Sequence, residues 1–343
     1  MLELDGSFGE GGGQILRTSL ALSLVTGKAF HLRNVRARRA KPGLQPQHLM
    51  SVHAAATVGQ AEAHGAALRS TDLMFTPGPV MPGTYRFDIG TAGAAGLVLQ
   101  TIYLPLAWRT LAPSTITLTG GTHVKASPCF HFLDVTWKQY MKLLGLHISL
   151  KMYQPGFYPR GGGVVEVFVQ PCERISSLRV TDWQKPARIT GTSAVAGLPS
   201  DIAARQARRA SWRLRQEGYK VDIPEERWDG GPGTVITLEL DTRPVPTLFF
   251  GLGERGKPAE RVADEAVEQA QVYLSARQPV DAHSADQLVL PLALAAEASV
   301  LHVSQITQHL LTNVAIIRKF VDREIVCEGE EGKPGVVRIE RGA

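Results

Sequence analysis

Residues 307–313, TQHLLTN, join two stretches whose hydrophobic residues recur with different periods. Apolar residues alternate along 300–306, which predicts a strand, whereas 314–321 has the spacing of a short amphipathic helix. Thr312 and Asn313 are both residue types that cap helices, so one of them is expected to begin that helix. The segment is therefore predicted to be the loop between a strand and a helix.

His309 lies within this predicted loop, a few residues before a helix N-terminus. The N–H groups of a helix N-terminus have no partner within the helix, and they favour an anion such as a phosphate. A lone histidine in a loop often does no more than pack or bond to backbone. Beside a phosphate, however, its imidazole can act as a nucleophile, so two interpretations of His309 stay open at this point.

The order strand, helix, strand, helix, strands recurs along the chain, which indicates internal repetition. The first unit is expected to cover 2–89, the second 90–169 and the third 284–339. Repeated units pack in quasi-equivalent ways, so that corresponding loops can face a common centre. On this interpretation the loop before the first helix of one unit corresponds to the equivalent loop of the other two.

A surplus segment of roughly 181–278 lies between the second and third units and has its own strand and helix patterns. We predict that it is a separate inserted α/β domain. The expected fold class is α/β (α+β), with a main domain formed by 1–180 and 279–343 and a smaller inserted domain of 181–278. Five arginines within 205–215 are expected on a solvated helix face, with a nucleic-acid contact as the alternative.

The 343 residues are 44% hydrophobic, which is enough for a sizeable core. A net charge of +5 and a pI near 9.1 favour anionic partners, with nucleic acid or nucleotide ahead of an acidic protein. The first residues lack the pattern of a signal peptide, and no apolar run approaches about 20 residues. We therefore expect a cytoplasmic protein with no membrane partner. Cys129, Cys172 and Cys327 are too few and too scattered to predict a disulfide framework or a metal cluster.

A Gly-rich loop at 9–14 precedes Arg17 on the first predicted helix. Backbone N–H groups freed by glycines can approach phosphates, and Arg17 could pair with phosphate oxygens. Glu10 could hold a divalent cation. The spacing fits neither the phosphate-loop nor the dinucleotide pattern, and a tight structural turn explains the glycines equally well. A second Gly-rich stretch at 251–257 fits the bare dinucleotide pattern and most of the phosphate-loop pattern. Pro258 replaces the Ser or Thr of the phosphate loop, and no following strand ends in a ribose-binding acid, so we discount both.

A basic group follows the predicted strand 29–35. Its charged members and the two polar residues just beyond them are Arg36, Arg38, Arg39, Lys41, Gln47 and His48. A run of charges is often merely solvated, but this one lies between two repeated elements, where phosphate binding is the alternative. Gln100 lies on an apolar helix and must be exposed or hydrogen-bonded. Asp286 begins the first helix of the third unit, where an acid either caps the helix or binds sugar hydroxyls or a base edge.

Several long motifs, in one order and over essentially the whole chain, resemble the RNA 3'-terminal phosphate cyclase family. They are GEGGGQILR at 9–17, RAKPGL at 39–44, QHL at 47–49, GFYPRGGG at 156–163, ADQLVLP at 285–291 and HLLTN at 309–313. Such a series is far more specific than any single motif. Two positions depart from the family pattern. Pro155 stands where a His or Arg usually precedes the fourth motif, and His131 stands where an acid is expected after Ser127-Pro128.

The resemblance implies three βαβαββ-type units and an ATP-dependent enzyme of the ligase class. Such an enzyme converts an RNA 3'-terminal phosphate to a 2',3'-cyclic phosphate. His309 would attack the α-phosphate of ATP and form a covalent histidyl-AMP. The AMP would pass to the RNA 3'-phosphate, and the neighbouring 2'-hydroxyl would then close the ring. The expected partners are ATP and RNA with a 3'-phosphate end, with Mg²⁺ or Mn²⁺ held at Glu10.

The remaining site residues are also implied by the resemblance. ATP would be bound by Arg17, Gln100, His283, Ser284, Ala285, Asp286, Gln287, and Phe249 or Phe250 stacked on adenine. Phosphate or RNA would be bound by Arg38, Arg39, Lys41, Gln47 and His48. The alternative is a non-catalytic relative that binds ribosomal RNA as an assembly factor. Such relatives lack the nucleophilic histidine, so the presence of His309, with Glu10 and Arg17, favours the enzyme.

Overall fold

The computed structural model describes residues 1–342 and contains three four-stranded sheets with the same strand order. The sheets are ordered β1-β2-β4-β3, β5-β6-β8-β7 and β9-β15-β17-β16. In each sheet the first pair of strands is parallel and the other two pairs are antiparallel. A parallel pair needs a crossover, and a helix supplies it in each unit. The repeated βαβαββ unit and the α/β fold class are therefore confirmed.

The helices and strands of the three units agree closely with the predicted elements. The first unit consists of β1 (Leu2–Asp5), α1 (Gly13–Thr26), β2 (Phe30–Arg33), α2 (Pro46–Val58), β3 (Glu62–His64) and β4 (Leu73–Thr76). The second consists of β5 (Thr84–Asp88), α3 (Ala95–Trp108), β6 (Ser114–Gly120), α4 (Phe130–Phe132), the π-helical turn η1 (Leu133–Trp137), α5 (Lys138–Leu143), β7 (Ile148–Gln154) and β8 (Gly163–Val169). The third consists of β9 (Arg179–Val180), α8 (Ala282–Leu292), β15 (Ser299–Val303), α9 (Gln308–Phe320), β16 (Ile325–Glu328) and β17 (Gly335–Ile339).

Two boundaries between the predicted units are wrong. Strand β5 was assigned to the end of the first unit, but it pairs in parallel with β6 and so begins the second. The third unit likewise begins before its first helix, because β9 pairs in parallel with β15. The surplus segment consequently lies between the first strand and the first helix of the third unit.

The surplus segment forms a sheet and a hydrophobic cluster of its own. Its elements are β10 (Arg188–Ala196), α6 (Asp201–Gln216), β11 (Lys220–Asp222), β12 (Glu225–Trp228), β13 (Gly233–Leu240), β14 (Thr247–Leu252) and α7 (Ala259–Ala276). Three of the arginines on α6 face acids or an amide of α7, since Arg205 pairs with Glu260 and both Arg209 and Arg213 pair with Asp264. These arginines join two helices. The division at 180/181 and 278/279 into separate domains stays a prediction.

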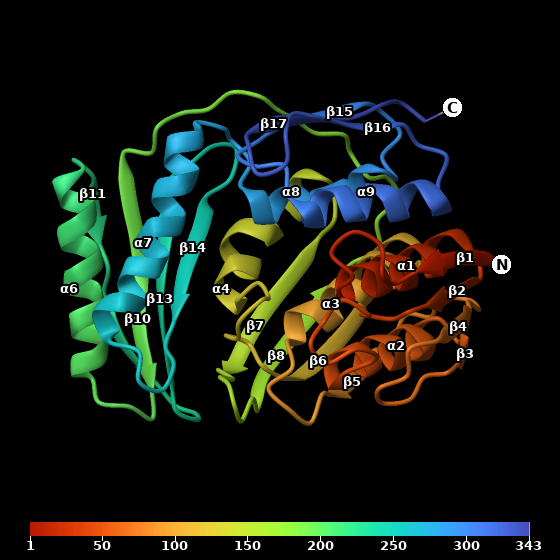
Figure 1. The fold of residues 1–343 in the computed structure, drawn as a ribbon, viewed down its shortest axis with the longest axis horizontal. Helices are drawn as coiled ribbons and strands as arrows, with labels where there is room; N and C mark the ends of the chain where they lie inside the picture. Colours follow the sequence, from red (N-terminus) through yellow and green to blue (C-terminus); the bar gives the residue numbers. More distant parts are fainter. Residues whose placement is uncertain (343) are drawn as a thin grey trace.

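The helices of the three units lie together, and the sheets cover them from outside (Figure 1). Helix α1 packs against α2, α3 and α9, and α8 packs against α9. Eleven consecutive residues of α1, from Ile15 to Val25, are buried, which explains why this helix shows no single apolar face. This arrangement brings the beginnings of several helices together. None of the helices within residues 1–342 is both long and apolar enough to cross a bilayer.

Helix α9 begins about six residues earlier than its hydrophobic pattern predicts. Thr307 is the N-cap, and its Oγ1 accepts a hydrogen bond of 3.0 Å from the N–H of Leu310. Thr312 is inside the helix and donates to the carbonyl oxygen of Gln308. The prediction that Thr312 or Asn313 caps the helix is therefore wrong, and His309 lies in the first turn of α9 rather than in a loop.

Asn313 is buried and joins three helices. Its Oδ1 accepts hydrogen bonds from Nε2 of Gln14 at 2.9 Å and from Oγ1 of Thr18 at 2.6 Å, both on α1. Its Nδ2 donates to the carbonyl oxygen of Asp286 on α8 at 2.8 Å. The side chain thus holds the first helices of units one and three against the helix that carries His309.

Replacing Asn313 by Ala should destabilise the protein by about 2 kcal/mol, because buried polar partners on α1 and α8 would be left without hydrogen bonds. Chemical denaturation measures the change. Lys319→Ala, at an exposed position of the same helix, is the matched control and should change the free energy of unfolding by less than about 0.5 kcal/mol. Equal losses in the two variants would contradict the role given to Asn313.

Candidate active site

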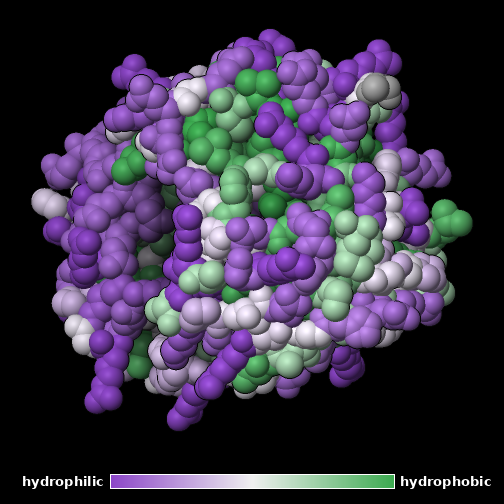
Figure 2. Space-filling model, turned by 45° about the vertical axis from the view of Figure 1, so that its right-hand side comes forward, coloured by the Kyte–Doolittle hydropathy of each residue, from purple (hydrophilic) through white to green (hydrophobic). Residues whose placement is uncertain are grey.

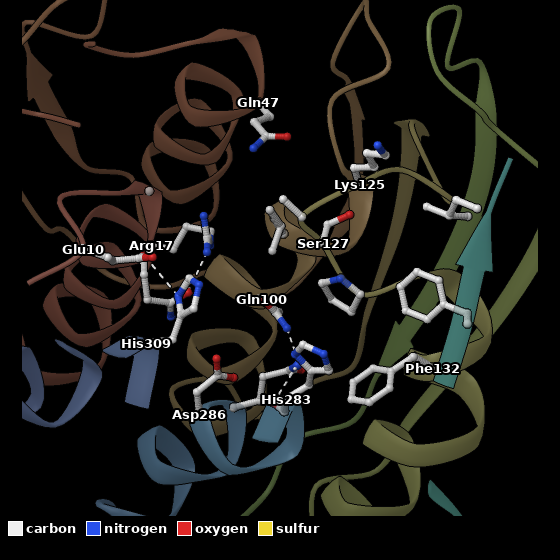
Figure 3. A pocket seen from close by; sticks show the side chains of 18 of the residues that line it. Glu10, Arg17, Gln47, Gln100, Lys125, Ser127, Phe132, His283, Asp286 and His309 are labelled. Carbon is white, nitrogen blue, oxygen red and sulfur yellow. Dashed lines mark hydrogen bonds and ion pairs between the residues drawn. The ribbon is translucent and has the colours of Figure 1, made fainter. Parts of the chain in front are cut away.

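A cavity of about 590 Å³ lies where the three units and the surplus segment meet. The first turns of four helices line it, with Gln14 from α1, Gln47 from α2, His283 from α8 and His309 from α9. Figure 3 labels the last three of these residues. Each helix N-terminus carries partial positive charge and N–H groups without helical partners. The face drawn in Figure 2 is hollowed, and its surroundings are mostly hydrophilic. The cavity therefore suits a large polyanion of the size of a nucleotide.

His309 and Glu10 form the central pair of the site. Nδ1 of His309 lies 3.1 Å from Oε1 of Glu10, and Oε2 of Glu10 accepts a hydrogen bond of 2.8 Å from Nη2 of Arg39. The Glu10 side chain is only 12% exposed, whereas that of His309 is 49% exposed and reaches the cavity. The carboxylate thus contacts the ring at Nδ1, while about half of the side chain stays exposed at the cavity.

The same contacts shift the pKa of both partners. The contact with Glu10 raises the pKa of His309 above its ordinary value, although burial acts against this. Burial alone would raise the pKa of Glu10, but His309, Arg39 and Arg17 outweigh it and the pKa is lowered. Glu10 is therefore ionised at pH 7, and it stabilises positive charge on the imidazole.

Arg17 is a buried cation beside this pair, with 9% of its surface exposed. Its Nη2 donates to Oε1 of Gln14 at 2.6 Å, while Nε has no hydrogen-bond partner among residues 1–342. Burial lowers the pKa of Arg17 to about 10, so the guanidinium remains charged at pH 7. A buried guanidinium that lines a cavity is well suited to pair with a phosphate oxygen.

The surroundings shift the pKa values of two further titratable groups. Burial, with Arg17 and other arginines nearby, lowers the pKa of His48 to about 3, so this ring is neutral. Burial raises the pKa of Asp286 to about 6, despite the opposing charges of His283 and His309. Asp286 is therefore largely ionised at pH 7. The lining still has a net positive charge, because Arg17, Arg36, Arg39, Lys125 and Lys257 outnumber Glu10, Glu265 and Asp286.

The Gly-rich loop allows side chains to lie unusually close to its backbone. A Cβ on Gly12 would stand 2.5 Å from Nη2 of Arg39, and a Cβ on Gly13 would stand 2.5 Å from Nε2 of His48. Any side chain at these positions would displace groups that line the cavity. Glycine at these two positions therefore allows the side chains of Arg39 and His48 to pack directly against the backbone of the loop.

Most of the residues predicted for the site line the cavity. They are Glu10, Arg17, Arg39, Gln47, His48, Gln100, Phe250, His283, Asp286, Gln287 and His309. Gln100 is hydrogen-bonded, as its place on an apolar helix required, since its Nε2 donates to Oε1 of Gln287 at 2.6 Å. Gln47 also has a structural task, because its Oε1 accepts from the N–H of Ala94 just before α3.

Five predicted site residues do not line the cavity. Phe249 is buried and packs against Tyr273, because neighbouring residues of β14 point to opposite faces and only Phe250 faces the cavity. Ser284 bonds to the N-cap Asp281, and Ala285 is fully buried in the core. The other two, Arg38 and Lys41, are exposed, with the Arg38 guanidinium donating to the carbonyl oxygen of Gly9.

The cavity also contains residues that were not predicted. Lys125 and Ser127 come from the segment between β6 and α4, and Lys257, Glu265 and Gln269 come from the surplus segment. Lys257 donates to Glu265 at 2.9 Å and to the carbonyl oxygen of Leu252 at 3.0 Å. The only signal for Lys257 was its place in the Gly-rich stretch at 251–257, and no periodicity marks the others.

Glu10 is the residue expected to hold a divalent metal. Its Oε1 faces Nδ1 of His309 and its Oε2 accepts from Arg39, so an ion here would use the remaining lone pairs of the carboxylate. A group of three possible metal ligands does not occur around Glu10 in the described chain. The donors therefore fit a magnesium-like ion held by one carboxylate and otherwise by substrate phosphates and water.

Comparison with known proteins agrees with this geometry. The family model described as RNA 3'-terminal phosphate cyclase matches residues 8–327. The RNA 3'-terminal phosphate cyclase of Pyrobaculum neutrophilum is 43% identical over 343 residues, covering 99% of this chain and 98% of that protein. Those of Ralstonia nicotianae and Salmonella typhimurium are 42% and 38% identical, covering 99% and 96% of this chain and 96% of each relative. The chain therefore belongs to the RNA 3'-terminal phosphate cyclase family.

Proposed function

We propose that this protein uses ATP to convert an RNA 3'-terminal phosphate to a 2',3'-cyclic phosphate, with His309 as the covalent nucleophile. The observation that carries the proposal is that Glu10 contacts Nδ1 of His309 in an arginine-rich cavity. About half of the His309 side chain remains exposed there. A buried carboxylate next to an exposed imidazole orients the ring and stabilises positive charge on it, which serves a nucleophile rather than a residue that only binds RNA. The enzyme is therefore favoured over the non-catalytic assembly factor.

Glu10 determines which ring nitrogen of His309 reacts. The proton resides on Nδ1, next to the carboxylate, so Nε2 keeps its lone pair. Nε2 attacks the α-phosphorus of ATP, the bond to the bridging oxygen breaks, and pyrophosphate leaves. Glu10 stabilises the positive charge that the ring acquires when the N–P bond forms.

The AMP then passes to RNA. An oxygen of the 3'-phosphate attacks the phosphorus, the N–P bond breaks and His309 is regenerated. The 2'-hydroxyl next attacks the 3'-phosphate, loses its proton and expels AMP, which closes the cyclic phosphate. Asp286, with a pKa of about 6, lies in the same cavity and is a candidate acceptor for such a proton.

The other lining residues have roles in binding. Arg17 and Arg39 would neutralise the triphosphate, and a magnesium or manganese ion on Glu10 would add positive charge at the phosphates. Phe250 offers a ring for adenine, while Gln100, His283 and Gln287 offer polar contacts to the nucleoside. Lys125 and Lys257 extend the basic lining, and we assign RNA phosphates to Lys125, Gln47 and the more exposed Arg38 and Lys41.

The proposal is tested by incubating the protein with metal and ATP that carries a radioactive α-phosphate. Label should remain on the denatured protein and be released by acid, as expected for a phosphoramidate. Addition of RNA with a 3'-phosphate should discharge the label and yield a cyclic end. His53→Ala, which removes an exposed histidine outside the cavity, is the matched control and should label normally. Persistent label in His309→Ala would refute the assignment.

The raised pKa of His309 predicts how adenylation depends on pH. Protonated imidazole has no lone pair on Nε2, so the single-turnover rate should rise with pH through that raised pKa and level off above it. Glu10→Gln removes the main cause of the shift, so the rise should move to lower pH while the plateau rate falls about 100-fold. A rise that stays in place in Glu10→Gln would contradict the pairing.

A further inference from the structure

A second cluster of polar side chains lies at the edge of the cavity and is not used by the proposed reaction. Nε2 of His123 lies 3.0 Å from Nδ1 of His131, and Cys129 is fully buried beside them. The two ring nitrogens and the Cys129 sulfur all lie within 4.8 Å of one another. These residues follow β6 in an H-x5-C-x-H arrangement. The cysteines are too scattered in the sequence to predict a metal cluster, but in the fold two histidines supply further possible ligands beside Cys129.

The hydrogen bonds around His123 are compatible with either tautomer of its ring. Oγ1 of Thr122 lies 2.8 Å from Nδ1 of His123 and accepts from the N–H of Gly156 at 2.8 Å. The facing nitrogens of the two imidazoles hold one proton between them, and the tautomers decide which ring donates it. If that proton moves to Nδ1 of His123, both facing nitrogens present lone pairs. The Thr122 hydroxyl then turns towards the carbonyl oxygen of Gly156, 3.5 Å away.

Aromatic packing fixes both rings in this orientation. The His131 ring stacks on Trp228 of β12, with centroids 5.3 Å apart and planes 12° from parallel. The His123 ring stacks on Phe157 with centroids 5.2 Å apart. Preorganised imidazoles with a polar group on the outer nitrogen are typical of metal-binding histidines.

We propose that His123, Cys129 and His131 bind one divalent ion of the zinc class through Nε2, Sγ and Nδ1. Ligands around tetrahedral zinc lie roughly 3.3–3.8 Å apart, so the facing nitrogens need to separate by only a few tenths of an ångström. Binding releases the thiol proton of Cys129 to solvent, and the shared imidazole proton moves to Nδ1 of His123. One thiolate and two neutral imidazoles then hold the ion, and water occupies the fourth position.

The ion would fix the segment that brings Lys125 and Ser127 to the active-site cavity. Its ligands lie at both ends of that segment, and Ala126 between them has a φ of +54°, in the left-handed region that non-glycine residues rarely adopt. A metal that joins the ends would hold this backbone in place. The His131 ring stacks on Trp228 of β12, so the ion would also hold residues 123–131 against the surplus segment. The site is structural, so the inference is independent of the proposed reaction.

The experiment uses the full untagged chain after removal of metals by a chelator. Titration with Co²⁺ should produce a thiolate-to-cobalt charge-transfer band that saturates at one ion per chain, and Zn²⁺ should abolish it. The double variant Cys172→Ser/Cys327→Ser retains only Cys129 and should give the same band. Glu10→Gln should also leave the band unchanged, which separates this ion from any metal at the phosphates.

Two variants remove ligands from the cluster. Cys129→Ser should lose the band and lower the Zn²⁺ affinity by at least about 100-fold. His131→Gln changes a partly exposed ring, is less prone to disturb folding, and should lower the affinity by at least about 10-fold. Absence of the band from the double variant, or its survival in Cys129→Ser, would overturn the proposal.

Discussion

His309→Ala should abolish formation of labelled protein and lower turnover of ATP and RNA by at least about 10⁴-fold. The side chain is half exposed, and within residues 1–342 its close polar contact is with Glu10, so the free energy of unfolding should change by less than about 0.5 kcal/mol. Single-turnover labelling and chemical denaturation measure the two quantities. A large loss of activity without a loss of stability is the signature of a residue that takes part in the chemistry.

A pre-adenylated RNA separates the nucleophilic role of His309 from a role in binding. Once AMP is attached to the 3'-phosphate, ring closure needs only the 2'-hydroxyl and the departure of AMP. His309→Ala should therefore convert this RNA to the cyclic product within about tenfold of the wild-type rate, since no bond to the imidazole forms in that step. If the variant fails equally with ATP and with the pre-adenylated RNA, His309 serves the site in another way.

The beginning of α9 shows where sequence patterns stop being sufficient. The apolar spacing of 314–321 identified the helix and pointed to Thr312 or Asn313 as its cap, whereas the structure begins it after Thr307. Thr307 became the cap because Asn313 is engaged by Gln14 and Thr18, which are almost 300 residues away in the chain. Packing of α1 against α9 therefore decided which residue begins the helix.

Site residues that belong to a sequence motif could be predicted. Where two adjacent residues were both candidates, only the structure showed which one faces the cavity. Phe249 and Phe250 are equivalent in sequence, but the face of β14 that turns to the cavity contains Phe250 and not Phe249. The spacing of Cys129 and its histidines matches no familiar metal-binding pattern, so its cluster became visible only in three dimensions. Membership of β5 in the second unit also depended on a pairing with β6 across the chain.

Arg17→Met should lower the rate of adenylation by about 10²- to 10³-fold, mainly in kcat, while Arg17→Lys should retain part of the activity. Arg17 is a buried cation with an unused N–H, and negative charge builds up on the departing pyrophosphate. Lysine restores the charge without the planar pair of donors. Single-turnover rates at saturating ATP measure the effect. Arg38→Met, in the same basic group but outside the cavity, is the matched control and should change the rate less than about threefold.

The stability of Arg17→Met provides an independent check on this interpretation. Burial lowers the pKa of Arg17, Glu10 and Asp286 favour its ionisation, and Arg36 and Arg39 oppose it. Methionine fills much of the same volume and removes both the cost of burying a charge and the attraction to Glu10 and Asp286, so the free energy of unfolding should change by less than about 1 kcal/mol. The pKa of His48, which Arg17 helps to depress, should rise at the same time, and NMR titration of that ring would show it. A strongly destabilised Arg17→Met would mean that the guanidinium holds the fold together, and its effect on the rate would then say nothing about phosphate binding.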